Sequence, residues 1–229
     1  MIEYPKINSL YKREGHDFKE TGIKPQHGKL LVGEYSCEEF KAIDRWTVTE
    51  KIDGTNIRIC MDKRTGSDII EFGGRTKDAL IPATLLTHLQ KTFTYEKMHE
   101  IFQGSTFVVL FGEGYGPKIQ NGSYYRKEQG FVLFDIFCSG WWLNRSAVED
   151  VASELRMPCV PLLHSPDHQY LWKKDDIVKF VQGKYLSDLA LNTTGESHEM
   201  EGIVARSEPL MMFRKGGPIM FKLKCKDFS

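Results

Sequence analysis

Residues 46–61 read WTVTEKIDGTNIRICM, and this stretch decides how the fold of the chain is interpreted. Its β-branched and apolar residues predict one strand over Trp46–Lys51 and another over Asn56–Met61. Between them, Lys51 leaves the first strand into an Asp53-Gly54 turn. One interpretation is an ordinary Asp-Gly hairpin with a surface lysine. The other is a nucleophilic lysine, which requires surroundings that remove its proton.

Similar apolar runs, separated by turn residues, recur along the chain. They predict further strands over Ile69–Phe72, Thr106–Gly112, Gly130–Phe137, Gly202–Arg206 and Ile219–Lys224. The second and third of these runs are apolar almost throughout, as is typical of central strands buried on both faces.

Helical patterns lie between the strands. A long helical stretch is expected over Leu80–Phe102, broken near Thr92–Tyr95, and a short helix after Asp175 and Asp176. Ser146 and Glu149 fit a capping box at the start of another helix. The polar residues 187–199 are expected to form a surface loop. Together these elements predict an α+β fold of antiparallel sheets flanked by helices.

The composition indicates a globular protein: 229 residues, 41% hydrophobic and 27% charged. The net charge is zero, which does not favour a strongly basic nucleic-acid binder unless charge is segregated, as in the acid-free run Arg214–Lys226. Five cysteines without a CxxC pair argue against a disulfide framework or a cysteine zinc site. No apolar run is long enough for a transmembrane helix, and the N-terminus lacks a signal peptide. We therefore expect a cytoplasmic protein that makes no membrane contact.

The Lys51-x-Asp53-Gly54 pattern resembles motif I of the covalent nucleotidyltransferases, which comprise DNA ligases, RNA ligases and mRNA capping enzymes. Further segments resemble the later motifs in their expected order. They are Gly74-Arg75-Thr76 (motif Ia), residues 106–114 ending in LFGEG (motif III), residues 130–137, GFVLFDIF (motif IIIa), residues 201–206, EGIVAR (motif IV), and residues 221–224, FKLK (motif V).

The resemblance implies the nucleotidyltransferase fold, which is ATP-grasp-like, and a set of site residues. Lys51 would be the nucleophile, assisted by Lys222 and Lys224. The expected nucleotide-binding residues are Glu50, Lys51, Ile52, Asn56, Arg75, Glu113, Phe134, Glu201, Lys222 and Lys224. Glu113 and Glu201 would hold Mg²⁺ or Mn²⁺, since hard cations prefer oxygen ligands. ATP would be the nucleotide.

Physical arguments support parts of this set. Lys222 and Lys224 are two residues apart on a predicted strand, so both face the same side. Two ammonium groups on one face favour a bound anion such as a triphosphate. Phe134 offers a face on which adenine could stack, or it is simply a core residue. Arg75 offers a planar fork for ribose or phosphate oxygens, or it is an ordinary surface residue.

Two features favour the RNA ligase branch and resemble the type-2 RNA ligases. Asn56 stands where DNA ligases and capping enzymes usually have arginine, and the segment Tyr4–Tyr11 resembles one upstream of motif I in this branch. The implied activity is the joining of 3′-hydroxyl and 5′-phosphate ends through a lysyl-AMP and an adenylylated 5′ end. The implied role is repair of RNA, either tRNA or a nick, with RNA or a nicked mixed RNA/DNA duplex as partner. A monomer is expected, and a phage-encoded enzyme acting in the host cytoplasm fits the resemblance.

Only five residues follow Lys224, so we expect one adenylation domain over residues 1–229, without a C-terminal OB or helical domain. Substrate would then need a groove on this domain. A groove of cations and aromatics is one interpretation of the basic C-terminal run together with Lys118, Tyr124, Tyr125, Arg126 and Lys127, and a polar loop is the other.

The sequence is also compatible with other functions. A minimal ATP-dependent DNA ligase would seal DNA nicks faster than RNA nicks. A capping guanylyltransferase would be labelled by GTP, although Asn56 argues against it. A non-catalytic nucleic-acid- or nucleotide-binding module could retain the fold, and a structural protein of unrelated fold would require all the motif matches to be accidental.

Overall fold

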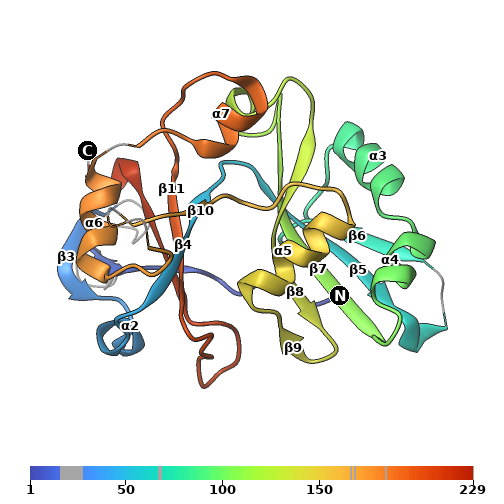
Figure 1. Ribbon diagram of the computed structural model, residues 1–229, viewed down its shortest axis with the longest axis horizontal. Helices are drawn as coiled ribbons and strands as arrows, with labels where there is room; N and C mark the ends of the chain where they lie inside the picture. Colours follow the sequence, from blue (N-terminus) through green and yellow to red (C-terminus); the bar gives the residue numbers. More distant parts are fainter. Residues whose placement is uncertain (16–27, 67–68, 166, 168, 184, 229) are drawn as a thin grey trace. The chain divides into compact units, whose positions relative to one another are not determined.

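A computed structural model describes residues 1–15, 28–66, 69–165, 167, 169–183 and 185–228. The chain divides into two compact units (Figure 1). Unit 1 comprises Met1–Pro5, Ile52–Val160 and Leu189–His198, and unit 2 comprises Lys6–Lys51, Pro161–Asp188 and Glu199–Ser229.

Unit 1 is built on a five-stranded antiparallel sheet in the order β6-β5-β7-β8-β9. The strands are β5 (Thr55–Asp62), β6 (Ile70–Gly73), β7 (Phe107–Tyr115), β8 (Gly130–Cys138) and β9 (Trp141–Trp142). The helical elements are α3 (Ala83–Thr92), α4 (Tyr95–Ile101), α5 (Arg145–Glu154) and the short 3₁₀ turns η1 (Lys63–Thr65) and η2 (Gly122–Tyr124). Helix α7 (Asp188–Thr194) belongs to unit 1 from its second residue onward.

Both faces of this sheet are covered, which explains the continuous apolar runs of β7 and β8. On one face, Leu85 of α3, Met98 of α4 and Val148 of α5 pack against buried strand residues. On the other face, Ile2 and Tyr4 of the N-terminal segment pack against an aromatic cluster. Burial on both sides removes the polar-apolar alternation that would otherwise mark a strand.

Unit 2 contains a second five-stranded sheet in the order β1-β12-β11-β4-β10, in which only β1 and β12 run parallel. Its strands are β1 (Asn8–Ser9), β4 (Trp46–Lys51), β10 (Leu162–Leu163), β11 (Gly202–Ser207) and β12 (Met220–Lys224). A separate two-stranded sheet pairs β2 (Tyr11–Arg13) with β3 (Leu30–Tyr35). The helical elements are α2 (Glu38–Ala42), α6 (Lys174–Gln182) and the 3₁₀ turn η3 (Cys225–Phe228). Trp46, Phe40 and Phe221 form the centre of its core.

The predicted α+β class is confirmed, and all seven predicted strands are present with small shifts at their ends. The break in the helical stretch is also confirmed, between α3 and α4. The hairpin interpretation of the Asp-Gly turn is wrong, because β4 and β5 belong to different sheets. The short strands β1, β2, β9 and β10 and the longer β3 were not predicted.

Two local predictions need correction. Helix α5 is capped by Asn144, whose side chain accepts from the backbone N–H of Ala147 at 3.0 Å, while the Ser146 hydroxyl donates to Asn144. Asparagine is as strong an N-cap as serine, so the helix begins earlier than the capping box predicted. The expected loop over residues 187–199 contains helix α7, whose Leu189 and Ala190 are buried.

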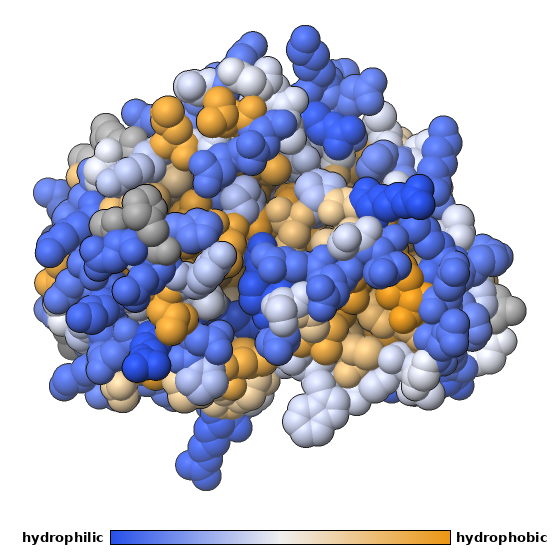
Figure 2. Space-filling view, viewed as in Figure 1, coloured by the Kyte–Doolittle hydropathy of each residue, from blue (hydrophilic) through white to orange (hydrophobic). Residues whose placement is uncertain are grey.

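Hydrophilic residues dominate the face shown in Figure 2, where hydrophobic residues emerge in separate patches. Among the described residues, no helix is both long and apolar enough to cross a membrane.

Candidate functional site

The C-terminal end of β4 brings Lys51 to two other motif residues in unit 2. In the sheet register Gly202 of β11 pairs with Lys51 on one side and with Lys224 of β12 on the other. Glu201, the residue before Gly202, therefore reaches both lysines. Lys51 Nζ lies 2.5 Å from Glu201 Oε2, and Lys224 Nζ lies 2.5 Å from Glu201 Oε1.

Glycine is required next to this carboxylate. The φ of Gly202 is +155°, and a Cβ at this position would lie 2.1 Å from the carbonyl oxygen of Leu223. Any side chain would therefore push β11 away from β12 and separate Glu201 from Lys224. The Glu-Gly pair of the EGIVAR segment is thus explained by close strand packing.

The alternation of β12 places its two lysines as predicted. Phe221 and Leu223 are buried in the core of unit 2, whereas Lys222 and Lys224 are half-buried on the opposite face. Lys51, Lys222 and Lys224 supply three ammonium groups, and Glu201 supplies one carboxylate. This face of the sheet therefore carries an excess of positive charge, which suits an anionic ligand.

The Glu50 side chain projects to the opposite face of the sheet from Lys51 and is 1% exposed. Its Oε1 accepts a hydrogen bond from the hydroxyl of Ser187, which is itself fully buried, at 2.5 Å. A buried carboxylate needs such a donor. The sequence offered no signal for Ser187, because it lies in the stretch that was expected to be a loop.

The turn after Lys51 is anchored within unit 1. Ile52 is buried in a small cluster with Tyr125 and Leu189. The backbone N–H of Asp53 donates to the hydroxyl of Tyr125 at 3.3 Å, and Asn121 Nδ2 donates to Asp53 Oδ2 at 2.7 Å.

One of the two interpretations of the sequence placed Tyr125 in a nucleic-acid groove, and its burial contradicts that interpretation for this residue. The side chain is 4% exposed and packs edge-on against Tyr115, so its ring cannot stack on a base. Asn121 was not identified from the sequence. Its role depends on the path of the loop that follows β7, which has no periodic signal.

Gly54 packs closely against β7. A Cβ at Gly54 would lie 2.3 Å from the carbonyl oxygen of Gly114 and 2.8 Å from Cγ of Glu113. The glycine of the Lys-x-Asp-Gly pattern therefore allows the turn to approach the strand that carries Glu113.

Asn56 and Glu113 form a cross-strand pair between β5 and β7. Directly opposed residues project to the same face, and Glu113 is half-buried while every other residue of β7 is buried. The Oδ1 atom of Asn56 is buried without a hydrogen-bond partner among the described residues. An unpaired buried oxygen beside a carboxylate fits a ligand that brings a hydroxyl or a hydrated cation, because leaving it unpaired is costly.

Phe134 and Arg75 are the remaining predicted residues in unit 1. The Phe134 ring is half-buried, and Tyr4 contacts it edge-on with the ring centroids 4.9 Å apart. Tyr4 also donates to the buried carboxylate of Asp135 at 3.0 Å. Arg75 is exposed beyond the end of β6, next to Gly74, whose carbonyl oxygen accepts from Arg58 at 2.6 Å.

The predicted site residues thus fall into two groups. Unit 2 holds Glu50, Lys51, Glu201, Lys222 and Lys224, and unit 1 holds Ile52, Asn56, Arg75, Glu113 and Phe134. The described residues contain no group of three or more His, Cys, Asp or Glu side chains that could hold a metal ion. Glu113 and Glu201 lie in different units, and their joint role as metal ligands stays a prediction.

Three cysteines are poor nucleophiles because of their surroundings. Burial raises the pKa of the Cys60, Cys159 and Cys225 thiols to about 11. The thiolate is the reactive form of cysteine, so these three side chains stay neutral and unreactive near neutral pH.

The architecture is similar to that of solved RNA ligases from Naegleria gruberi. A ligand-free variant of that enzyme matches 97% of this chain and 55% of its own length, with 17% identity and a TM-score of 0.60. A variant solved with ATP and Mn matches 99% of this chain and 64% of its own, with 19% identity and a TM-score of 0.59. A structure with PPi matches 98% of this chain and 60% of its own, with 18% identity and a TM-score of 0.55. At these identities the likeness shows the fold, which is the nucleotidyltransferase fold that the motifs implied.

The chain spans 55% of the length of the first of these structures, less than two thirds. No match was found among curated protein sequences. The family model described as RNA ligase matches residues 44–224, which include every predicted site residue and most of the 229-residue chain. The chain therefore belongs to the RNA ligase family.

Proposed function

We propose that this chain is the adenylation domain of an ATP-dependent RNA ligase that joins 3′-hydroxyl and 5′-phosphate ends in RNA repair. The observation that carries the proposal is the contact of Lys51 and Lys224 with the two oxygens of Glu201. Residues from three separate motifs meet there on a positively charged sheet face, as a lysine nucleophile acting on a polyphosphate requires.

In the first step, Lys51 Nζ attacks the α-phosphorus of ATP after losing a proton. A P–N bond forms, the bond to the β-phosphate oxygen breaks, and pyrophosphate leaves with its charge balanced by Lys222 and Lys224. Glu201 holds Lys51 and Lys224 at the end of β4, so it can orient the nucleophile and accept its proton. Structures of Naegleria gruberi RNA ligase with ATP and Mn support ATP and a divalent cation here.

In the second step, an oxygen of the RNA 5′-phosphate displaces Lys51 from the AMP phosphorus, so that the P–N bond breaks and the adenylylated end forms. In the third step, the 3′-hydroxyl loses its proton to solvent and its oxygen attacks the RNA phosphorus of that end, so that a phosphodiester bond forms, the anhydride bond breaks and AMP leaves. A divalent cation bound through Glu113 of unit 1, or through Glu201 of unit 2, would stabilise the charge that develops on the phosphate oxygens. The unpaired Oδ1 of Asn56 beside Glu113 fits a hydrated cation or a ribose hydroxyl at this position.

The test is formation of enzyme-bound AMP. The chain is incubated with α-labelled ATP and Mg²⁺ or Mn²⁺ and analysed on denaturing gels, after mass spectrometry has shown that it is not already adenylylated. Label is expected with ATP and not with α-labelled GTP. Lys51→Arg keeps the positive charge opposite Glu201 but lacks an amine, so it should remain unlabelled. Lys91→Ala, which changes an exposed lysine of α3, should label like the wild type.

The absence of label in folded wild-type protein would contradict the proposal and favour a binding module. Labelled protein is then given nicked duplexes with RNA or DNA at the nick. Faster sealing of RNA is expected, and faster sealing of DNA would favour a minimal DNA ligase.

A further inference from the structure

The loop between β7 and β8 in unit 1 presents one tyrosine outward and its neighbour inward. Tyr124, the last residue of η2, is 52% exposed, whereas Tyr125 is 4% exposed. The Tyr124 ring lies beside the His198 ring, with centroids 4.6 Å apart and an angle of 33° between the planes. A largely exposed tyrosine ring therefore projects from this part of unit 1, with a partly exposed histidine ring beside it.

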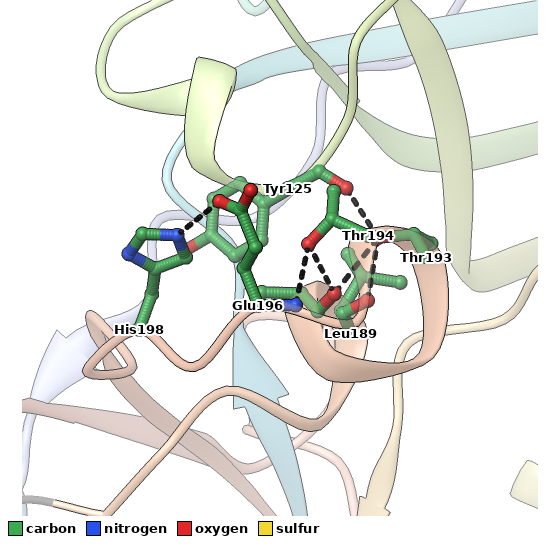
Figure 3. Close-up of polar contacts among 7 residues, drawn as sticks. Tyr125, Leu189, Thr193, Thr194, Glu196 and His198 are labelled. Carbon is green, nitrogen blue, oxygen red and sulfur yellow. Dashed lines mark hydrogen bonds and ion pairs between the residues drawn. The ribbon is translucent and has the colours of Figure 1, made fainter.

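The pair is held in place from both sides. The Thr193 hydroxyl donates to the backbone carbonyl of Tyr125, which joins the end of α7 to the loop (Figure 3). Beyond α7, the backbone N–H of Glu196 donates to the Thr194 hydroxyl at 3.2 Å. The Glu196 carboxylate then lies 3.4 Å from Nε2 of His198, which orients the imidazole (Figure 3). Because these contacts already order the rings, the entropic cost of fixing them when a ligand binds is lower.

The loop is also joined directly to the turn that follows the proposed nucleophile. The hydroxyl of Tyr125, the residue after Tyr124, accepts from Asp53, and Asp53 is only two residues from Lys51 in the chain. A ligand on the Tyr124 and His198 rings would therefore lie on the same loop that anchors the Lys-x-Asp-Gly turn.

Cations accompany the rings on this loop. Lys127 and Lys118 are both exposed, Lys118 has a φ of +66°, and both lie within ten residues of Tyr124. Glu128 and Glu196 also lie here, so the charge is mixed, and Glu196 is directed to His198. Aromatic faces flanked by cations are the combination that binds single-stranded nucleic acid, with rings for the bases and ammonium groups for the phosphates.

We propose that Tyr124 and His198 form a stacking platform for an unpaired base of the RNA strand that is to be joined, with Lys118 and Lys127 contacting its phosphates. This inference rests on the proposed function for its choice of RNA as ligand. It assigns the strand a place on unit 1, and it separates Tyr124 from Tyr125, which the sequence alone treated as equivalent.

The test measures fluorescence anisotropy of a labelled, 5′-phosphorylated single-stranded RNA titrated with wild-type and variant chains. Tyr124→Ala and His198→Ala should each weaken binding, with a loss of about tenfold for Tyr124→Ala. Tyr124→Phe keeps the π-face and should bind like the wild type. Lys127→Glu should reduce the dependence of affinity on salt.

The matched control is Tyr170→Ala in unit 2, because Tyr170 is 60% exposed and its ring also pairs with a histidine, His164, at 4.8 Å. It should bind RNA like the wild type. The proposal is wrong if Tyr124→Ala binds within twofold of the wild type, if Tyr170→Ala loses as much affinity, or if the wild-type chain binds no RNA.

Formation of enzyme-bound AMP is measured in the same variants. All should label like the wild type, because the platform contacts RNA and not the nucleotide. A wild-type chain that binds RNA through Tyr124 but forms no adenylate would support the platform and contradict the proposed function. Normal formation of enzyme-bound AMP, with no effect of Tyr124→Ala on RNA affinity, would support the proposed function and contradict the platform.

Discussion

Nζ of Lys51 lies 2.5 Å from Oε2 of Glu201, although 150 residues separate them in the chain. The contact follows from the pairing of β4 with β11, which sets Lys51 opposite Gly202. Glu201 thus holds the proposed nucleophile at the edge of a sheet face that also carries Lys222 and Lys224.

Glu201→Gln should abolish most of the proposed adenylylation of Lys51 while leaving the chain folded. The amide keeps the shape of the side chain but removes the negative charge that two ammonium groups share. Loss of a charged hydrogen-bond partner costs about 1.5–3 kcal/mol, or about 10- to 160-fold in rate, and loss of a metal ligand would add to this. The measurement is the rate of label transfer from α-labelled ATP. Glu199→Gln, an exposed neighbour, is the control and should react normally. A rate for Glu201→Gln close to that of the wild type would show that the carboxylate is not required.

Tyr125→Phe should slow enzyme-AMP formation by about 2- to 13-fold, because a neutral hydrogen bond to the Asp53 N–H contributes about 0.5–1.5 kcal/mol. Asn121→Ala should slow it by about tenfold, since its bond is to a carboxylate. Both act by positioning the turn after Lys51, so the rate constant should change more than the apparent KM for ATP. Tyr124→Phe is the matched control. A purely structural role would instead lower the melting temperature without changing the rate constant.

Ser187→Ala should destabilise the chain by about 1–3 kcal/mol, because it leaves the buried carboxylate of Glu50 without this donor. Urea unfolding followed by circular dichroism measures the change in the free energy of unfolding. Ser153→Ala on the exposed face of α5 should cost nothing, since alanine is the better helix former. Equal stability of Ser187→Ala and the wild type would mean that Glu50 finds another partner.

The buried thiols predict a loss of stability at high pH. Burial raises the pKa of Cys60 from 9.0 to about 11, so the folded state favours the neutral thiol. The resulting stabilisation is present below pH 9.0 and is lost as the pH rises towards about 11. Cys60→Ala should therefore lose less stability than the wild type between these pH values, by up to about 2 kcal/mol. Val109→Ala, at the position opposite Cys60 in the sheet, leaves a cavity without removing a titrating group and should keep the wild-type slope.

The sequence alone determined the class of the fold and the identity of most candidate residues. Strand periodicity is local, so β4, β5, β7, β8, β11 and β12 could be located from their apolar runs. The alternation of β12 is equally local, and it placed Lys222 and Lys224 on one face. The order of the motifs indicated the family that the comparison of residues 44–224 then established.

Only the tertiary structure decided which side chains meet. The bonds from Ser187 to Glu50, from Asn121 to Asp53 and from Tyr125 to Asp53 span 137, 68 and 72 residues. Such contacts depend on which strands pair, in which register, and on the path of loops that have no periodic signal. The same reason explains why the Asp-Gly turn looked like a hairpin. Local sequence specifies a tight turn, but the partners of β4 and β5 are chosen by long-range packing in two separate sheets.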